Sequence, residues 1–409
     1  MLVMPTGQPA TFRIATKRLS AVAVILAIAS AAPSYSQHGG VPPDRKPPPI
    51  ARQDRPAAEG LELVRGFDET PGNVAITPEG RVFMSMHPFG NPKARVIEVL
   101  AEGGTRPYPT PTWSSAVGAN GVGIQSIIGI KSDAEGVLWM LDAGNLNEPG
   151  GSPPKLVAWD TKVDRLVRVI HLPPPASRAS SFLQDFVIDA AHDAIYIADS
   201  GIGAGFEKTT PAIVVVYLKT GVSRRILENA ECVRGDLSGT MTIDGKQLQV
   251  AGADGKLMAP VVGINPIALD GKGEWVYFGA MHGTTMWKVR AADLANPGLN
   301  NEAFVERIEK AGPKPPSDGI AVDTADNIYV TDVMKHAIGV LEANGTYRVL
   351  IQDPRLQWPD GITAGPDGHF YVVANQLNRH AALNGGVDEM KAPFVLLRFK
   401  PLAPAIVGR

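Results

Sequence analysis

Two stretches of the chain repeat one pattern: PSDGIAVDTADNIYVTD (Pro316 to Asp332) and WPDGITAGPDGHFYVVAN (Trp358 to Asn375). In each, an acid and a glycine precede a short apolar run, a turn rich in Asp, Gly or Pro follows, and a second apolar run contains a tyrosine. Two apolar runs joined by turn residues predict a β-hairpin. A hairpin that recurs within so short a length of chain indicates a repeat architecture.

Four earlier segments match the same pattern, which brings the number of repeats to six. They are Gly72 to Met86, Ile128 to Asp142, Gln184 to Asp199 and Asn265 to Ala280. The second strand of each repeat is built around an aromatic residue: Phe83, Trp139, Tyr196, Tyr277, Tyr329 and Tyr371. The alternative, a β-sandwich with coincidental turns, would not place an aromatic residue at one offset in every repeat.

A third strand follows the hairpin in each repeat, and a fourth strand follows in several. The third strands are expected at Ala94 to Leu100, Lys155 to Asp160, Ala212 to Leu218, Thr284 to Arg290, Ala337 to Ala343 and Phe394 to Lys400. RLVRVIHL, SRRILEN and TYRVLIQ are candidates for fourth strands. Units of four strands repeated around an axis are typical of propellers. We therefore predict an all-β fold, a six-bladed β-propeller.

Two further segments complete the predicted ring. No fourth strand follows Phe399, so we expect LELVRGF (Leu61 to Phe67) to supply the outer strand of the sixth blade. The longest gap between repeats holds MTIDGKQLQVAGADGKLM (Met241 to Met258), which we expect to form an inserted hairpin between blades three and four.

The N-terminal region has the pattern of an export signal. Arg13, Lys17 and Arg18 precede the apolar run Leu19 to Ala32, which is shorter than the roughly 20 residues that a membrane span needs. An uncleaved anchor is the alternative. We expect residues 1–36 to be a signal peptide, 37–60 a proline-rich linker, 61–403 the propeller and 404–409 a tail. The mature protein is then secreted or periplasmic, without a membrane span.

Composition excludes several classes of function. The formal net charge is -2 and the sequence has no long run of Lys or Arg, so it predicts no basic surface that could bind a polyanion. We therefore expect no nucleic-acid partner. Cys232 is the only cysteine, which rules out an intrachain disulfide and a cysteine-ligated metal. No motif of a serine esterase, a zincin or a nucleotide-binding protein is present. The sequence does not indicate the oligomeric state.

Polar residues recur where the first strand of each blade begins. In a propeller this strand runs beside the central channel, so equivalent positions converge on the axis. Blades four, five and six carry Asn265, Asp318 and Asp360 there, and blades one and three carry Asn73 and Asp185, with Gln184 just before Asp185. Blade two has Ile128 instead.

Three interpretations of these residues remain open. Carboxylate and amide oxygens are the ligands that Ca²⁺ prefers, so Asp185, Asn265, Asp318 and Asp360 are candidate ligands of Ca²⁺ or another divalent cation. The acids could instead bond backbone N–H groups, with the glycine serving a tight turn. Thirdly, Asn73, Gln184, Asn265, Asp318 and Asp360 could bind an organic ligand directly.

The candidates for acid–base chemistry are two histidines and one of these acids. His87 and His282 follow the second strands of blades one and four, on loops that could reach one end of the channel. Either histidine, or Asp185, is a candidate to move a proton. The alternative for both histidines is an ordinary loop position. Asp142, Asp199 and Asp332 end their strands before turn residues and are interpreted as turn caps.

The strings FLQDFVIDAAHDAIYIADSG, VVGINPIALDGKGEWVYFGAMHGTTMWKV and KPPSDGIAVDTADNIYVTD resemble the major royal jelly protein and Yellow family. The resemblance extends from about Leu61 to Lys400. It implies a secreted six-bladed propeller, in a family whose members are linked to dopachrome conversion or bind small biogenic amines in the channel. Insect members commonly carry paired cysteines, whereas Cys232 has no partner here.

A more distant resemblance is to the gluconolactonase and senescence-marker propellers. In these proteins a glutamate, two asparagines and an aspartate hold a divalent cation, and Asn265 and Asp318 stand in comparable contexts. The glutamate expected near Asn73 is missing. Three hypotheses follow: a Yellow-type propeller that binds a small organic molecule and shifts a proton on a catechol-derived substrate, a metal-dependent lactone hydrolase, or a binding protein without turnover.

Overall fold

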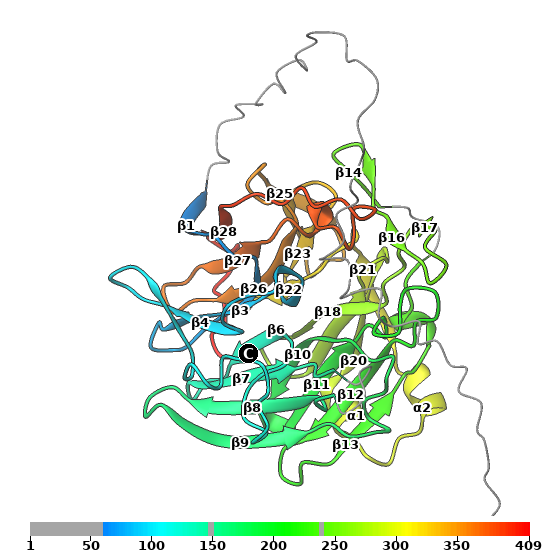
Figure 1. The fold of residues 1–409 in the computed structure, drawn as a ribbon. Coiled ribbons are helices and arrows are strands. Elements are labelled where there is room, and N and C mark those ends of the chain that lie inside the picture. Colours follow the sequence, from blue (N-terminus) through cyan, green and yellow to red (C-terminus); the bar gives the residue numbers. More distant parts are fainter. Residues whose placement is uncertain (1–59, 146–150, 237–240) are drawn as a thin grey trace, which may run out of the picture. The chain divides into compact units, whose positions relative to one another are not determined.

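The repeated hairpins form the inner halves of six four-stranded antiparallel sheets. The structure, a computed structural model, describes residues 60–145, 151–236 and 241–409. The expected signal peptide and all of the expected linker except Gly60 lie outside the described residues. The sheets are the blades of a propeller, which confirms the predicted fold class (Figure 1).

The blades follow one another along the chain. Blade one contains β2 (Pro71–Ile76), β3 (Val82–Met86), β4 (Val96–Val99) and β5 (Thr105–Pro107), and blade two contains β6 (Ile127–Ser132), β7 (Val137–Asp142), β8 (Lys155–Asp160) and β9 (Arg165–His171). Blade three contains β10 (Leu183–Asp189), β11 (Ala194–Asp199), β12 (Ala212–Tyr217) and β13 (Ser223–Ile226). In blade four β18 (Ile264–Leu269), β19 (Trp275–Ala280), β20 (Thr285–Arg290) and β21 (Glu309–Pro313) pair, with the short helices α1 (Ala291–Ala295) and α2 (Asn301–Val305) before the last strand.

The last two blades close the ring. Blade five contains β22 (Ile320–Val322), β23 (Ile328–Asp332), β24 (Ala337–Leu341) and β25 (Tyr347–Gln352). Blade six is built from β26 (Pro359–Ala364), β27 (Phe370–Ala374), β28 (Phe394–Phe399) and the N-terminal strand β1 (Leu61–Phe67). β1 pairs antiparallel with β28, from Leu61 opposite Phe399 to Phe67 opposite Phe394. The prediction that Leu61 to Phe67 completes the sixth blade is therefore confirmed.

Burial explains the apolar repeats. The innermost strands β2, β6, β10 and β18 are buried along their whole length, and each packs against the inner strand of the next blade around the ring. The recurring aromatic residue lies in the second strand and is also buried in every blade. In four blades its polar atom donates to an aspartate of the preceding turn: Trp139 to Asp133, Tyr196 to Asp189, Tyr329 to Asp323 and Tyr371 to Asp367. The repeat thus couples each turn to its own blade.

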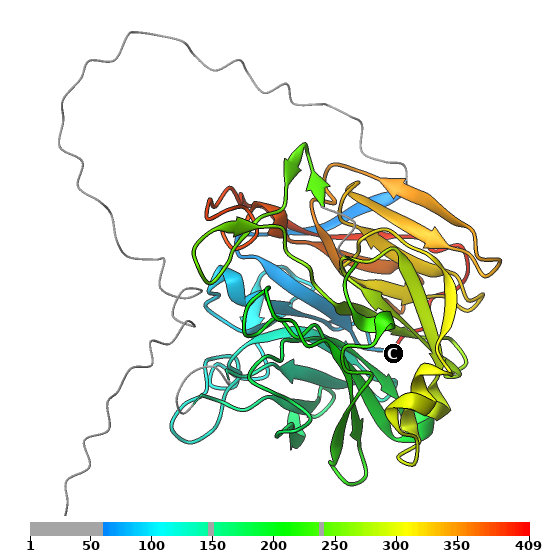
Figure 2. The same cartoon turned by 90° about the vertical axis from the view of Figure 1, so that its right-hand side faces the viewer.

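The insertion between blades three and four contains two short hairpins, so the expectation of a single one was wrong. They are β14 (Thr242–Ile243) with β15 (Lys246–Gln247), and β16 (Val250–Ala251) with β17 (Leu257–Met258). The sequence has two turn signals, Asp-Gly at 244–245 and Asp-Gly at 254–255, and each closes its own hairpin. Gln249 pairs with Asn384 in the loop after β27, and the two segments lie side by side in both views (Figures 1 and 2).

The C-terminal residues cross the turns of blades five and four. The backbone N–H of Ala403 donates to Asp323, and the N–H of Thr324 donates to Pro404. Arg409 ends this path with a 2.6 Å hydrogen bond to the carbonyl of Asp270. In the part of the chain that the structure describes, no helix is long and apolar enough to cross a membrane.

Candidate functional site

A backbone irregularity places the candidate site residues. The ladder between the first and second strands shifts register near the start of the inner strand in five blades, between Pro71/Val74, Ile127/Ile130, Leu183/Phe186, Ile264/Ile267 and Pro359/Ile362. Asn73, Asp185, Asn265 and Asp360 all lie inside these shifts, and Asp318 lies just before β22. Irregularities of this kind re-aim side chains. Here they coincide with the residues expected on the axis.

The glycine after each acid serves close packing between blades. A Cβ on Gly319 would lie 2.3 Å from the carbonyl oxygen of Asp360, and a Cβ on Gly361 would lie 1.7 Å from Oδ1 of Asn73. Neither glycine has a positive φ. The tight-turn explanation for the Asp-Gly pairs therefore does not hold, and the reason for glycine is the close approach of the neighbouring blade.

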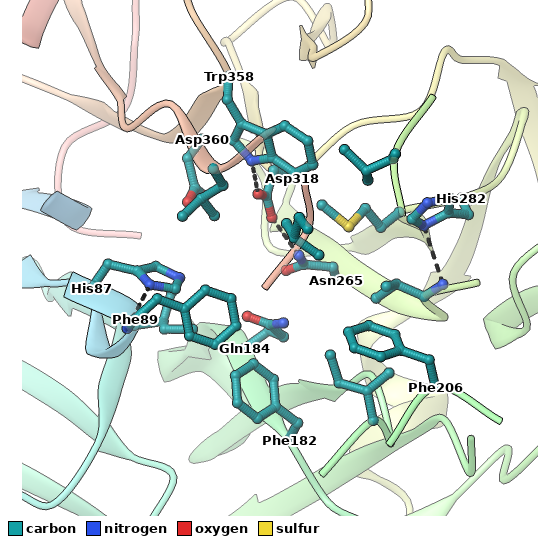
Figure 3. Close-up of a pocket in the computed structure, with 17 residues that line it drawn as sticks. His87, Phe89, Phe182, Gln184, Phe206, Asn265, His282, Asp318, Trp358 and Asp360 are labelled. Carbon is teal, nitrogen blue, oxygen red and sulfur yellow. Dashed lines mark hydrogen bonds between the residues drawn. The ribbon is translucent and has the colours of Figure 1, made fainter. Parts of the chain in front are cut away.

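A pocket opens at this end of the channel, with apolar walls and a polar floor (Figure 3). The free space between its walls, counted together with open solvent at the mouth, is about 490 Å³. Phe182, Phe206, Met281 and Trp358 contribute to the walls, together with Leu248 of the insertion. The floor is formed by Gln184, Asn265, Asp318 and Asp360. Such a combination is typical of sites for small organic molecules.

Asp318 is held by two N–H donors. Nε1 of Trp358 donates to its Oδ2 at 2.6 Å, and Nδ2 of Asn265 donates to its Oδ1. Burial raises the pKa of Asp318 to about 6, although both hydrogen bonds favour the charged form and lower it. The negative charge of Asp185 adds to the rise. Trp358 was not singled out from the sequence, although it stands two residues before Asp360.

Fewer hydrogen bonds stabilise the charged form of Asp360 than that of Asp318. One hydrogen bond reaches its Oδ2, from Nδ2 of Asn375 at 2.7 Å. Burial raises the pKa of Asp360 well above its ordinary value, and the neighbouring charges of Asp318 and Asp185 add to the rise. Two buried acids of unequal environment thus face one pocket, which is an arrangement suited to exchange of protons.

Asp185 and Asn73 lie at the axis but do not line the pocket. Asp185 forms a buried ion pair with Lys131, whose Nζ is 3.2 Å from its Oδ2, and its Oδ1 accepts the N–H of Phe186. Burial raises the pKa of Asp185, and the Lys131 charge opposes this rise. Asn73 accepts the N–H of Val74. Lys131 was missed by sequence reasoning because nothing local links it to Asp185.

Both predicted histidines line the pocket, on opposite sides of it in Figure 3. Nδ1 of His87 accepts the N–H of Phe89, and Nδ1 of His282 accepts the N–H of Val262. Burial lowers the pKa of His87 to about 3 and that of His282 to about 4. Both rings are therefore neutral at physiological pH. Nε2 of His282 has no hydrogen-bond partner among the described residues.

The four predicted metal ligands do not form a cage for a divalent cation as they are arranged. Lys131 neutralises Asp185, both oxygens of Asp318 accept hydrogen bonds, and Asn265 directs its amide N–H₂ at Asp318. Calcium requires 6–8 well-aimed oxygens. In residues 60–145, 151–236 and 241–409, no group of three or more His, Cys, Asp or Glu side chains is placed to hold a metal ion.

The three acids that end second strands act as turn caps, as expected. Asp142 accepts the N–H groups of Gln125, Ser126 and Gly144, and Asp199 accepts those of Phe182 and Gly201. Asp332 accepts the N–H groups of Met334 and Lys335. These carboxylates are structural, which separates them from the acids of the channel.

Comparison with solved structures supports the fold. A calcium-binding regucalcin from Agrobacterium tumefaciens superposes with a TM-score of 0.53 at 13% identity, over 86% of this chain and 98% of that one. A gluconolactonase from Xanthomonas campestris superposes with a TM-score of 0.50 at 12% identity, over 85% and 99% of the two chains. At such low identity the likeness concerns the architecture alone.

Comparison of sequences identifies the family. Major royal jelly protein 3 of Apis mellifera is 36% identical over 113 residues, a match that spans 25% of this chain and 21% of that protein. The chain thus covers about a fifth of the length of this relative. The family model described as "Major royal jelly protein" matches residues 125–403, more than half of the chain. The chain therefore belongs to the major royal jelly protein family.

Proposed function

We propose that the pocket at the channel mouth binds a small organic molecule, and that Asp318 and Asp360 catalyse a tautomerase-like proton shift on a catechol-derived ligand bound there. The observation that carries the proposal is a pair of buried carboxyl groups on the floor of an apolar-walled pocket. Aromatic walls suit a flat ring, and the acids suit its polar substituents.

The two acids have different roles in the proposed proton shift. Asp318 accepts two N–H bonds, which favour its carboxylate, so it serves as the base that removes a proton from a ring-adjacent C–H. Asp360 has one such bond and serves as the acid that delivers a proton to another position of the ligand. One proton leaves and one arrives, so the ligand isomerises without a redox change. Water at the open mouth restores the starting protonation.

The neutral histidines support this assignment to the acids. His87 and His282 each use Nδ1 to accept a backbone N–H, which leaves Nε2–H as a donor. A neutral donor at the wall can orient a ligand oxygen. Removing a proton would require a free ring nitrogen lone pair, and in both histidines that lone pair is already used. We therefore place His87 and His282 in ligand binding rather than proton transfer.

The test compares matched Asp→Asn variants in dopachrome conversion and in ligand binding. Asp318→Asn and Asp360→Asn are expected to lower turnover by roughly 10²–10⁴-fold, the usual contribution of a general acid or base, and to bind the ligand still. Asp367→Asn, in a turn of blade six outside the pocket, is the control and should match the wild type. Binding to the wild type without turnover would make the protein a non-catalytic binder. If the wild type neither binds nor converts the ligand, the proposal that this pocket is its binding site is wrong.

We further propose that the mature protein is exported to the periplasm or secreted. The basic residues before Leu19 to Ala32 and the small residues after this apolar run support it. Expression of the full chain, followed by fractionation and N-terminal sequencing, provides the test. A product that begins shortly after residue 30 in the exported fraction is expected, and a full-length chain in the membrane fraction would indicate an anchor.

A further inference from the structure

We infer that the ammonium group of Lys131 is the resident cation of the central channel and takes the place that a divalent metal ion would fill among its acids. The inference concerns the charge at the centre of the propeller and does not depend on the proposed proton shift. The predicted calcium ligands have other partners: Lys131 pairs with Asp185, and N–H donors reach both oxygens of Asp318.

Blade two provides the lysine at a position where the other blades have none. In each blade one inner-strand residue lies opposite the recurring aromatic residue of the second strand. In blade two this residue is Lys131, opposite Trp139. The equivalents in the other blades are small or apolar, or a threonine: Ala75, Val187, Ala268, Ala321 and Thr363. Blade two is also the blade with an apolar residue, Ile128, at the rim.

Lys131 approaches the acids from the end of the channel opposite the mouth. Lys131 lies toward the far end of its strand and lines the cavity at the opposite end of the channel. Its ammonium nevertheless lies 3.2 Å from Asp185, which belongs to the rim of the mouth, and both side chains are more than 90% buried. A buried ammonium is tolerated when a carboxylate neutralises it, and strongly disfavoured otherwise. The pair therefore holds the long side chain in this position.

The charge of Lys131 acts on more than one acid. It favours the charged form of Asp360 as well as that of Asp185, while the charges of Asp318 and Asp185 disfavour the charged form of Asp360. The other buried lysines are engaged elsewhere: Lys155 pairs with Asp142, and Lys314 donates to two carbonyls and to Ser317. Among the described residues, the interactions with these channel acids thus single out Lys131 as their counter-ion.

The consequence is that calcium and Lys131 exclude each other. A cation that entered the channel beside Asp185 would meet the ammonium at close range, and like charges in a buried site repel strongly. With the lysine replaced by an apolar residue of similar length, the acids would lack a counter-ion. They would then gain stability from a divalent cation that enters from the mouth.

The experiment measures cation binding, using wild type, Lys131→Met, and the double variant Lys131→Met/Asp185→Asn. Each protein is titrated with calcium chloride by calorimetry, and its melting temperature is recorded with and without millimolar calcium. We expect no binding and no shift for the wild type. For Lys131→Met we expect binding and a melting temperature raised by several degrees, and the double variant should lose most of this response because one carboxylate and its charge are gone.

Two results would overturn the inference. The first is calcium binding by the wild type that is abolished by Asp318→Asn, since the lysine would then coexist with a metal. The second is a folded Lys131→Met protein that ignores calcium and magnesium alike. If Lys131→Met folds only with calcium, the inference is supported. If Lys131→Met folds neither with nor without calcium, the calcium titration of the wild type is the remaining test of the inference. The double variant then shows whether the protein tolerates loss of the Lys131–Asp185 ion pair.

Discussion

The two ends of the central channel are built from the same inner strands but differ in chemistry. At the strand starts the ladders are irregular, and side chains such as Asn265 and Asp360 are directed toward the axis. At the strand ends the ladders are regular, and most residues that line the cavity there are apolar, such as Val187, Ile267 and Ala364, although Lys131 and Arg409 also line it. The difference shows that register shifts, as well as residue types, distinguish the end that carries the pocket from the opposite end.

The two ends are also covered differently. The insertion and the loop after β27 lie at the mouth, where Leu248, Leu377 and Leu383 line the pocket. The C-terminal segment lies at the far end, where Ile406 and Arg409 line the second cavity. We expect changes at the far end to act on stability, and changes at the mouth to act on ligand binding.

The largest effect should follow removal of residues 402–409. Four backbone or side-chain hydrogen bonds would be lost, from Leu402, Ala403, Thr324 and Arg409. At about 1 kcal/mol each, with the packing of Ile406 in addition, we expect the free energy of unfolding to fall by roughly 3–5 kcal/mol. Urea denaturation measures this change. Ligand affinity at the mouth should stay as in the wild type, and a large loss of affinity would mean that the two ends are coupled.

The next effect should follow Gly361→Ala, at the mouth. The new Cβ would overlap Oδ1 of Asn73, so the side chain or the two blades must shift. We expect a loss of about 3 kcal/mol in the free energy of unfolding, toward the upper end of the range for overpacking. The double variant Asn73→Ala/Gly361→Ala removes the obstructing amide and should recover part of the loss. Equal stability of the single and double variants would argue against this contact.

The sequence predicts the repeated features of this protein and misses the long-range ones. The blade pattern, the closing strand and the convergence of Asp318 and Asp360 follow from local spacing, because every blade repeats the same geometry. The ion pair between Lys131 and Asp185 joins residues 54 positions apart, and the contact of Trp358 with Asp318 spans 40 positions. No local pattern specifies which side chain will cross the channel.

The predicted metal ligands illustrate the same limit. Residue types did predict that carboxylates and amides gather at this end of the channel, as Gln184, Asn265, Asp318 and Asp360 do. What a sequence does not show is which hydrogen-bond donors reach them. Asn265 directs its N–H₂ rather than its oxygen at Asp318, and the indole of Trp358 takes the second oxygen. The partners therefore decide the chemistry of the acids, and they come from neighbouring blades.

A third effect concerns the pH dependence of stability at the mouth. The pKa of His282 is about 4 in the folded protein because of burial, and is about 6.5 when unfolded. Between these values the unfolded chain binds a proton that the folded protein does not, so stability falls as the pH falls from about 6.5 to 4. The expected slope is roughly 1.4 kcal/mol per pH unit.

His282→Gln isolates this contribution. Glutamine can accept the N–H of Val262 and does not titrate, so the variant should lose the slope assigned to His282. Asp318 acts in the opposite direction: its raised pKa of about 6 makes stability fall as the pH rises from about 4 to 6. The free energy of unfolding is measured by urea denaturation at each pH for both proteins. Subtracting the variant's values from those of the wild type removes the contribution of Asp318, which both proteins share. Identical slopes would show that the pKa of His282 is the same in the folded and the unfolded protein.

The smallest change in stability should come from the ion pair that fastens the insertion at the mouth. His336 lies 2.7 Å from Asp244, the first residue of the turn between β14 and β15. Burial raises the pKa of Asp244, but the hydrogen bond and charge of His336 outweigh it and the pKa is lowered overall. Asp244 is half exposed, so Asp244→Asn should cost less than about 1 kcal/mol of unfolding free energy.

The kinetics of the ligand should respond more clearly than stability to this variant. The insertion contributes Leu248 to the pocket wall, so a looser insertion should let a bound ligand leave several-fold faster while its association rate changes little. Stopped-flow displacement measures the dissociation rate. Lys246→Gln, which removes the neighbouring exposed ion pair with Glu389, is the matched control and should have a weaker effect. A dissociation rate unchanged in Asp244→Asn would show that the insertion is a fixed wall, held at the mouth by packing rather than by this ion pair.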